Sequence, residues 1–253
     1  MMIYVYDGTW NGMMTLVHRT AREGALPDDI LRFSPNGSSG VLLDSTEVRS
    51  DPSLAEATAA VLEERLGRRW MSEACLALMS EEKGIDLAVW RCLSRLWKEG
   101  ARAAADLAAP CMGAVLHAAR RSFRELHRWM GLIRFRDVGG VYYAPFAPDC
   151  DVLPLLAGHF RSRLPARWVL HDTGRGRAAL HEAGRWFLTD AALPAHLRIT
   201  REEEVCQALW QEFFRSTAVR ERISAKRQSN FLPRKTWAYL IEKPGAASWG
   251  RSG

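Results

Sequence analysis

The stretch Ile3–Gly12 reads IYVYDGTWNG: aliphatic and aromatic residues alternate, and an acid, two glycines and a threonine follow. The alternation from Ile3 to Tyr6 predicts a β-strand. Thr9 can cap a following helix, because apolar residues recur every three or four positions from Trp10 to Ala21. The residues between strand and helix form either a tight turn or a loop that holds a ligand. They lack the Gly-Lys-Ser/Thr ending of a phosphate-binding Walker loop, which favours the turn.

The composition is that of a globular protein. The chain has 253 residues, of which 47% are hydrophobic and 25% charged, enough for one domain or two small ones. No apolar run reaches the roughly 18 residues of a membrane span, and no secretory signal is evident. The five cysteines are odd in number and lack C-x-x-C spacing, which predicts reduced thiols in a cytoplasmic protein. We expect no cofactor, no metal site and no membrane partner.

The net charge of +6 is concentrated in two segments. Residues 215–243 carry +6 and residues 117–136 carry +5, so the rest of the chain carries −5. Charge that serves only solubility would be spread more evenly. The pattern is typical of a surface that binds a polyanion such as nucleic acid.

The periodicity predicts an α+β protein, with helices packed on a small, mostly antiparallel sheet. A single domain is expected over residues 1–243, with a sub-boundary near 100–112 and a flexible tail at 244–253. Asp51-Pro52 predicts a helix start and Gly67 its end. The Pro/Gly/Ser-rich residues 26–40 predict a loop. Other helices are expected at 72–83, 86–98, 115–130, 152–163 and 200–222, and strands at 41–43, 132–136, 141–143, 167–170, 178–181 and 185–188.

The expected helix 115–130 has a basic stripe beside its apolar face. The stripe consists of His117, Arg121, Arg124 and Arg128, at the spacing of one helical face. The expected hairpin after this helix adds Arg134 and Arg136 on one face of a strand. Such a stripe either binds phosphates or is only a solvated helix face.

The second basic segment mixes cations with aromatic residues. Residues 225–240 read AKRQSNFLPRKTWAYL, with four cations, Lys226, Arg227, Arg234 and Lys235. Cations bind phosphate oxygens, and exposed aromatic rings stack on unpaired bases. The alternative is that Phe231, Trp237 and Tyr239 pack this segment onto the body of the protein.

Residues that could support catalysis are few. No G-x-S-x-G motif and no H-E-x-x-H motif is present. His171 and Asp172 end an expected strand, where a general base could lie, although a turn-forming role for Asp172 is favoured. The candidates for catalysis are Asp7, Glu125, His127, His159 and Asp172.

Taken together, these residues resemble a bacterial family of DNA metabolism proteins of unknown activity. The resemblance is carried at the N-terminus by Tyr6, Asp7, Gly8, Thr9 and Gly12. Further along the chain it is carried by Glu125-Leu126-His127, Gly131, Arg134-Phe135, Ala144, Pro148-Asp149, Leu153 to Leu156, His159-Phe160, Arg163, Trp168, Asp172, Arg175, Trp210, Phe213-Phe214, Arg222, Gln228, Leu232-Pro233-Arg234, Trp237, Leu240 and Glu242. Two positions depart from the family pattern: Ser224 stands in place of Asn, and Thr236 in place of an aromatic residue.

The resemblance implies a partner and a process. Members of the family accompany a radical S-adenosylmethionine protein that modifies or repairs DNA, and some are fused to a uracil-DNA-glycosylase-like domain. This chain has no cysteine triad for an iron–sulfur cluster, so radical chemistry would belong to the partner. The shared N-terminal motif makes a ligand role for Asp7 as plausible as a turn.

Three hypotheses about function follow. The first is a DNA-binding accessory protein that acts with the radical enzyme. It would use Arg121, Arg124, Arg128, Arg134, Lys226, Arg227, Gln228, Arg234, Lys235 and Trp237. The second is an enzyme acting on DNA or a nucleotide through the carboxylate and histidine candidates. The third is a protein–protein adaptor.

Overall fold

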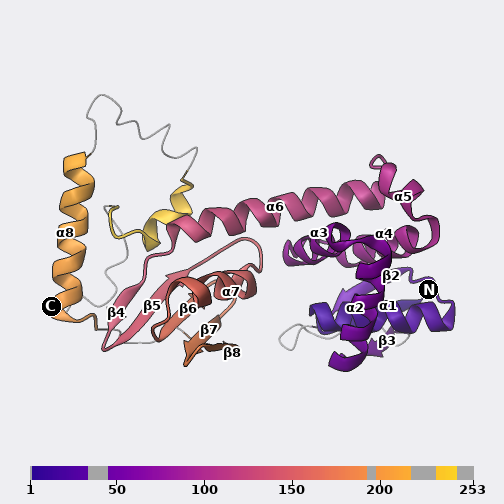
Figure 1. Cartoon of the computed structure of the whole chain (residues 1–253), viewed down its shortest axis with the longest axis horizontal. Helices are drawn as coiled ribbons and strands as arrows, with labels where there is room; N and C mark the ends of the chain where they lie inside the picture. The colour runs from indigo at the N-terminus through magenta and orange to yellow at the C-terminus, as the bar shows by residue number, and fades with distance from the viewer. Residues whose placement is uncertain (1, 34–44, 193–197, 218–231, 244–253) are drawn as a thin grey trace. The chain divides into compact units, whose positions relative to one another are not determined.

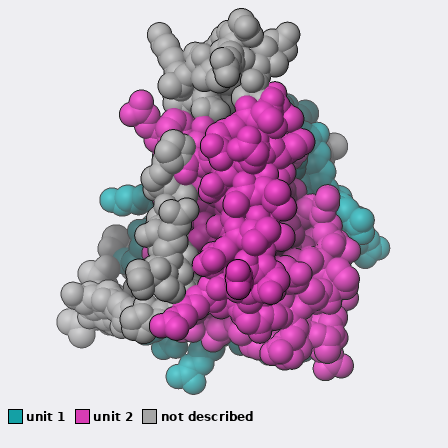
Figure 2. Space-filling model, turned by 90° about the vertical axis from the view of Figure 1, so that its left-hand side faces the viewer, with its two compact units in different colours: residues 1–124 teal, residues 125–253 magenta. Residues whose placement is uncertain are grey.

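The computed structural model describes residues 2–33, 45–192, 198–217 and 232–243. Two compact units divide the chain, Met1–Arg124 and Glu125–Gly253 (Figure 2). Each has its own hydrophobic core: the buried residues of the first core end at Ala119, and those of the second begin at Leu126. Whether the two units behave as one domain, as the sequence analysis expects, stays a prediction.

The first unit is built on a three-stranded parallel sheet, called sheet A here. Strand β1 (Ile3–Tyr6) lies between β2 (Asp29–Arg32) and β3 (Ser45–Val48). Helix α1 (Trp10–Glu23) connects β1 to β2, as a crossover between parallel strands requires. The prediction missed β2, because its four residues lie in the stretch rich in turn-forming residues.

Helices make up most of the rest of the first unit as far as the structure describes it (Figure 1). They are α2 (Pro52–Leu66), α3 (Arg68–Met79), α4 (Ile85–Glu99), α5 (Ala101–Ala105) and the beginning of α6 (Pro110–Leu132). Helix α2 begins and ends where Asp51-Pro52 and Gly67 predict, with the Asp51 carboxylate accepting a hydrogen bond from the Leu54 amide at 3.0 Å. Helix α6 begins before and runs past the range 115–130 expected for it.

The second unit contains a five-stranded sheet, called sheet B, in the order β4-β5-β6-β7-β8. The strands are β4 (Arg136–Val138), β5 (Val141–Phe146), β6 (Trp168–Asp172), β7 (Arg177–Glu182) and β8 (Arg185–Asp190). The described part of the unit also contains helix α7 (Leu153–Arg163), helix α8 (Arg201–Thr217) and the 3-10 helix η2 (Arg234–Tyr239). The core lies against one face of sheet B, with Trp129, Phe146 and Trp168 among its largest buried side chains.

The predicted combination of helices and strands is confirmed, but the sheets differ from the expected mostly antiparallel one. Sheet A is parallel, and sheet B is mixed because β5 and β6 run parallel. Strand β5 also extends past Tyr143, through Pro145. This is tolerated because β4 begins at Arg136, opposite Tyr143, so no residue of β4 lies opposite Pro145 to require the amide hydrogen bond that proline cannot donate.

Candidate nucleic-acid interface

Two members of the predicted basic stripe on α6 are already engaged by carboxylates. Arg121 Nη1 lies 2.9 Å from Glu82 Oε1, and Arg128 Nη1 lies 3.3 Å from Glu125 Oε2. Both arginine side chains are half-buried. A guanidinium that is held in an ion pair has to give up that partner before it can bind a phosphate.

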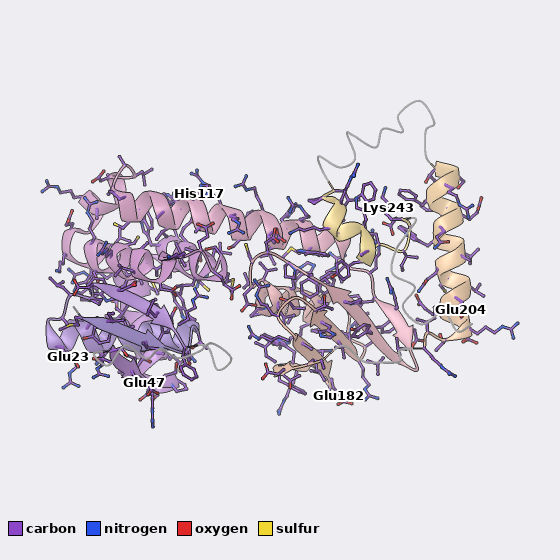
Figure 3. All side chains as sticks on the ribbon, turned by 180° about the vertical axis from the view of Figure 1, so that it is seen from behind. Glu23, Glu47, His117, Glu182, Glu204 and Lys243 are labelled. Carbon is purple, nitrogen blue, oxygen red and sulfur yellow. The ribbon has the colours of Figure 1, made fainter. Side chains whose placement is uncertain are left out.

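The solvent-facing side of α6 in the first unit carries the other two members of the stripe, His117 and Arg124, together with Arg120. His117, Arg120 and Arg124 are all exposed and follow one another at spacings of three and four residues. This spacing keeps them on one helix face; His117 is labelled in Figure 3. Arg124 Nε donates to the Arg120 carbonyl at 3.2 Å, and neither arginine has an ion-pair partner among the described residues. Arg120 was missed by the sequence analysis, although its three-residue spacing from His117 is visible in the sequence.

Two predicted cations in the described part of the second unit are likewise paired. Arg134 Nη2 lies 2.8 Å from Glu242 Oε1, and Lys235 forms an ion pair with Asp149. Arg234 is exposed and has no such pair within the described part of the chain. Lys226, Arg227 and Gln228 lie outside the described residues.

Trp237 is held by neighbours on its own segment. Its indole Nε1 donates to the Leu232 carbonyl at 3.0 Å, and Lys243 Nζ lies 4.6 Å from its ring centroid. Tyr239 packs edge-on against the buried Trp129, with ring centroids 5.9 Å apart. These contacts fit the alternative in which the aromatic residues fix the last segment to the body of the unit.

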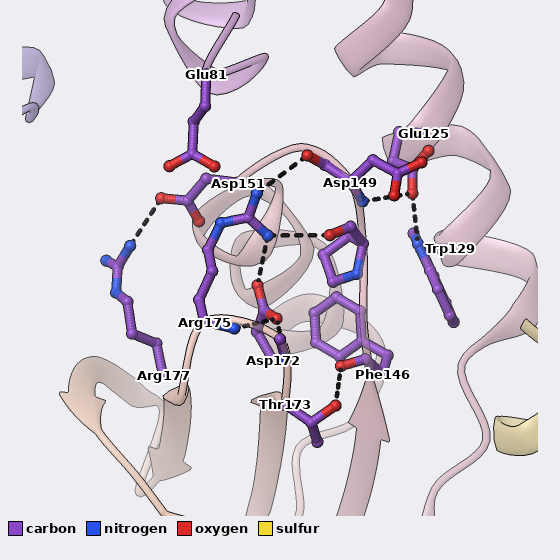
Figure 4. Close-up of polar contacts among 12 residues, drawn as sticks. Glu81, Glu125, Trp129, Phe146, Asp149, Asp151, Asp172, Thr173, Arg175 and Arg177 are labelled. Atoms are coloured by element: carbon purple, nitrogen blue, oxygen red, sulfur yellow. Dashed lines mark hydrogen bonds and ion pairs between the residues drawn. The ribbon is translucent and has the colours of Figure 1, made fainter. Parts of the chain in front are cut away.

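The two basic segments meet at Glu125 in the second unit. This carboxylate is only 5% exposed, and it lies between Arg128 at 3.3 Å and Lys235 at 3.8 Å. It also accepts hydrogen bonds from Trp129 Nε1 at 3.0 Å and from the Asp149 amide at 3.1 Å (Figure 4). Glu125 therefore joins α6, the loop before α7 and η2, and it neutralises the cations that surround it.

Asp172 organises the loop at the end of β6. Its carboxylate Oδ1 accepts from the amides of Gly174 at 3.0 Å and Arg175 at 3.1 Å, the pattern of a turn closed by an aspartate. Arg175 Nη1 donates to Asp172 Oδ2 and to the Pro148 carbonyl, each at 3.0 Å (Figure 4). Burial raises the pKa of Asp172, while Arg175 and the loop amides act to lower it.

The structure does not gather the catalytic candidates into one hydrogen-bonded group. Glu125 and Asp172 each bond the loop of Pro148 and Asp149, directly or through Arg175, but they do not bond each other. His127 is exposed on α6, and His159 packs edge-on against Phe160 on α7, with centroids 5.0 Å apart. No group of three or more metal-ligating side chains was found in the described parts of the chain.

A buried tyrosine–histidine pair on sheet B was not anticipated. The Tyr143 hydroxyl lies 2.7 Å from His171 Nδ1, and His171 Nε2 lies 3.2 Å from the Ala191 carbonyl. Because a carbonyl can only accept, Nε2 carries the proton and Nδ1 accepts from Tyr143. Burial lowers the pKa of His171 and raises the pKa of Tyr143 to about 12, so both side chains are neutral near pH 7.

Arg136, opposite Tyr143 in the β4–β5 register, is a cation of the first basic segment that is almost fully buried. It is 5% exposed, and its Nε has no hydrogen-bond partner among the residues that the structure describes. Burial lowers its pKa, while the nearby Glu203 carboxylate acts to raise it. Its buried position removes it from any exposed phosphate-binding surface.

The N-terminal motif forms a closed turn. Asp7 Oδ1 accepts from the Thr9 amide at 2.9 Å, and Asp7 Oδ2 accepts from Ser50 Oγ at 2.6 Å. Thr9 Oγ1 accepts from the Gly12 amide at 3.0 Å and so caps α1. Gly8 has a φ of +76°, a conformation that glycine adopts without strain. The geometry accounts for Asp7, Gly8, Thr9 and Gly12 as parts of a turn, while the Tyr6 hydroxyl donates to Asp86 within the core.

Comparison with known protein families shows where this chain belongs. A family model described as a domain of unknown function (DUF4130) matches residues 83–242. None of the curated proteins matches the chain. The matched segment contains α4 to α8 and all of sheet B, and it leaves out the strands of sheet A.

Proposed function

The chain belongs to the family of the domain of unknown function DUF4130, and from this premise we propose that it is a DNA-binding accessory protein. The proposal assigns phosphate binding to the exposed face of α6 that carries His117, Arg120 and Arg124. The two arginines are always charged at physiological pH and project where a nucleic-acid backbone can reach them.

The observation that carries the proposal is that Arg120 and Arg124 are exposed and have no ion-pair partner among the described residues. Binding to DNA gains free energy mainly by neutralising phosphates and releasing the counterions condensed on them. A cation already paired with a carboxylate gains less, because the pair has to break first. Arg121 and Arg128 are such cations, so they are secondary in this proposal.

The enzymatic alternative is less favoured. Glu125 and Asp172 use their oxygen atoms to accept bonds from main-chain amides and neighbouring cations. A general base needs a free oxygen within reach of the proton that it removes. Both carboxylates are better suited to holding loops in place.

The partner in this proposal is a radical S-adenosylmethionine protein, as the resemblance implies. The partner would carry out the reaction that modifies or repairs DNA. This chain would bind the DNA backbone and so bring the DNA to the partner. Of the adaptor hypothesis, the proposal keeps only the contact between this chain and the radical S-adenosylmethionine protein.

The test is a fluorescence anisotropy titration with labelled single- and double-stranded DNA at several salt concentrations. We expect binding that weakens steeply with salt. The plot of log association constant against log salt concentration should be less steep, by about 2 in the size of its slope, for the double variant R120Q/R124Q than for the wild type. The matched control is R121Q on the same helix, which should leave the slope nearly unchanged because Arg121 is paired with Glu82.

Two results would overturn the proposal. One is the absence of binding to either form of DNA at low salt, and the other is an equal slope for the wild type and R120Q/R124Q. Co-purification with the radical enzyme, followed by the same titration on each protein and on the complex, tests the accessory role separately.

A further inference from the structure

Strand β8 leaves one border of sheet B open. It pairs with β7 and with no other described strand (Figure 1). Five of its six residues are exposed, and Phe187 is 57% and Leu188 36% exposed. Exposed aromatic and aliphatic side chains on an open strand edge are a known route to pairing with another chain.

The turn before β8 fixes which main-chain groups face outward. Ala183 and Gly184 form a two-residue turn with φ of 50° and 77°, so Glu182 and Arg185 are the closing pair. Along the hairpin, hydrogen-bonded residue pairs then alternate with pairs that are not hydrogen-bonded. The bond from the Ala191 amide to the Gly176 carbonyl at 2.8 Å follows this alternation. Phe187 and Thr189 therefore bond to β7. The amides and carbonyls of Trp186, Leu188 and Asp190 point to the open edge.

The edge lacks most of the features that normally prevent pairing. The register with β7 is continuous over six residue pairs, without a bulge, and the strand contains no proline and no lysine. Its charged residues, Arg185 and Asp190, lie at opposite ends, and the centre is apolar.

A second copy of the same strand fits this edge in one register. Residues whose amides and carbonyls point to the open edge have to lie opposite residues of the same kind in the second copy. A two-fold antiparallel pair near the middle of the strand is therefore centred on either Phe187 or Leu188. Centring on Phe187 sets it opposite the partner's Phe187 and sets Trp186 opposite the partner's Leu188. Centring on Leu188 instead would set Trp186 opposite the partner's Asp190, so the first register matches apolar residues better.

Charge favours the antiparallel direction as well. In this register, Arg185 lies opposite the partner's Thr189 and one residue from the partner's Asp190. A parallel pair would bring the arginines together and the aspartates together, which is unfavourable.

We propose that the chain self-associates through β8, forming a two-fold dimer in which sheet B continues across both copies. A six-residue strand buries much less than the roughly 1,600 Å² of a standard interface. The dimer is therefore expected to dissociate readily, with a Kd on the order of 10–100 µM. This inference does not depend on DNA binding.

Sedimentation velocity over a range of protein concentrations tests the proposal. The wild type should shift from monomer to dimer across the expected Kd, and F187K should raise the Kd at least about tenfold by placing a charge at the centre of the pair. The matched control is F213K, because Phe213 on α8 is also 57% exposed and lies outside the proposed interface. A wild type that stays monomeric at several times the expected Kd overturns the proposal, and so does an F213K variant that dissociates while F187K does not.

Cysteine cross-linking tests the register. In a C206S background, which removes the exposed thiol, F187C should form an intermolecular disulfide under mild oxidation. The opposed Cα atoms of a non-hydrogen-bonded pair lie about 4.5 Å apart, within reach of a disulfide. L188C should cross-link much more slowly, because Leu188 opposes Trp186 in this register. Preferential cross-linking of L188C would show the other register and overturn the proposed one.

Discussion

His171 shows how a single buried residue departs from its ordinary chemistry. Its ring lies between the Tyr143 hydroxyl and the Ala191 carbonyl, and it is 2% exposed. A protonated ring could no longer accept from Tyr143, and its charge would be poorly solvated. The fold therefore stabilises the neutral form, with the proton on Nε2.

We predict a pH dependence of stability from this residue. Burial lowers the pKa of His171 below its ordinary value of 6.5, so between these two values the unfolded chain binds more protons than the folded chain. The free energy of unfolding should therefore fall as the pH falls below about 6.5, by at most about 1.4 kcal/mol per pH unit for one group. Urea unfolding at several pH values between 5 and 8 measures this effect.

The control is H171Q, which keeps a side chain able to accept from Tyr143 but does not titrate. Its stability should vary less with pH than that of the wild type over the same range. Parallel curves for the two proteins would show that His171 keeps an ordinary pKa in the folded state.

At the scale of elements, the junction of β1 and α1 depends on a close approach that only glycine permits. A Cβ atom on Gly12 would lie 2.2 Å from Asp7 Oδ1 and 2.7 Å from a ring carbon of Tyr6. Both distances are far below van der Waals contact. Asp7 cannot easily move away, because it is bonded to Thr9 and Ser50.

We predict that G12A destabilises the protein by about 1–3 kcal/mol, because overpacking outweighs the gain in helix propensity. The matched control is G113A on α6, where a new Cβ meets nothing closer than 3.9 Å. That change should be neutral or stabilising by up to about 1 kcal/mol. Thermal or urea unfolding of both variants decides the matter, and equal effects would contradict the steric explanation.

Helix α6 shows what periodicity can and cannot predict. Its amphipathic pattern predicts the helix and most of its apolar face: Leu116, Ala119 and Leu126 are buried as expected, whereas Phe123, expected on the same face, is 56% exposed. Periodicity does not reveal that Glu82 and Glu125 engage two members of the basic stripe. Arg121 and Arg128 are therefore less available to a phosphate than the periodicity alone suggests.

At the scale of the whole molecule, the two hydrophobic cores share no residue. Two separate cores allow each unit to unfold at its own free energy, whereas a single domain loses protection throughout at once. Measuring whether the two units lose protection from hydrogen exchange separately or together therefore tests the expected single domain.

We predict that G12A speeds amide hydrogen exchange in the first unit and leaves the second unit unchanged. Gly12 lies in the first unit, and the nearest atoms that an added Cβ would meet belong to Asp7, Tyr6 and Ser50 of the same unit. Exchange followed by mass spectrometry on peptides from residues 2–33 and 45–124, compared with 125–192, measures the difference. An equal increase in both sets would show one cooperative domain.

The sequence by itself determined most helices, strands β5 to β8 of sheet B, the capped start of α2 and the two basic segments, because these depend on neighbouring residues and local periodicity. The strand expected at 132–136 was wrong, since α6 extends to Leu132 and β4 begins only at Arg136. Only the tertiary structure decided the parallel sheet A, the buried state of Arg136 and which cations remain unpaired. Those features depend on contacts between residues that are distant along the chain, such as Arg134 with Glu242 and Lys235 with Asp149. Pairing at such separation is set by how the chain folds back on itself, and the local sequence pattern does not contain that information.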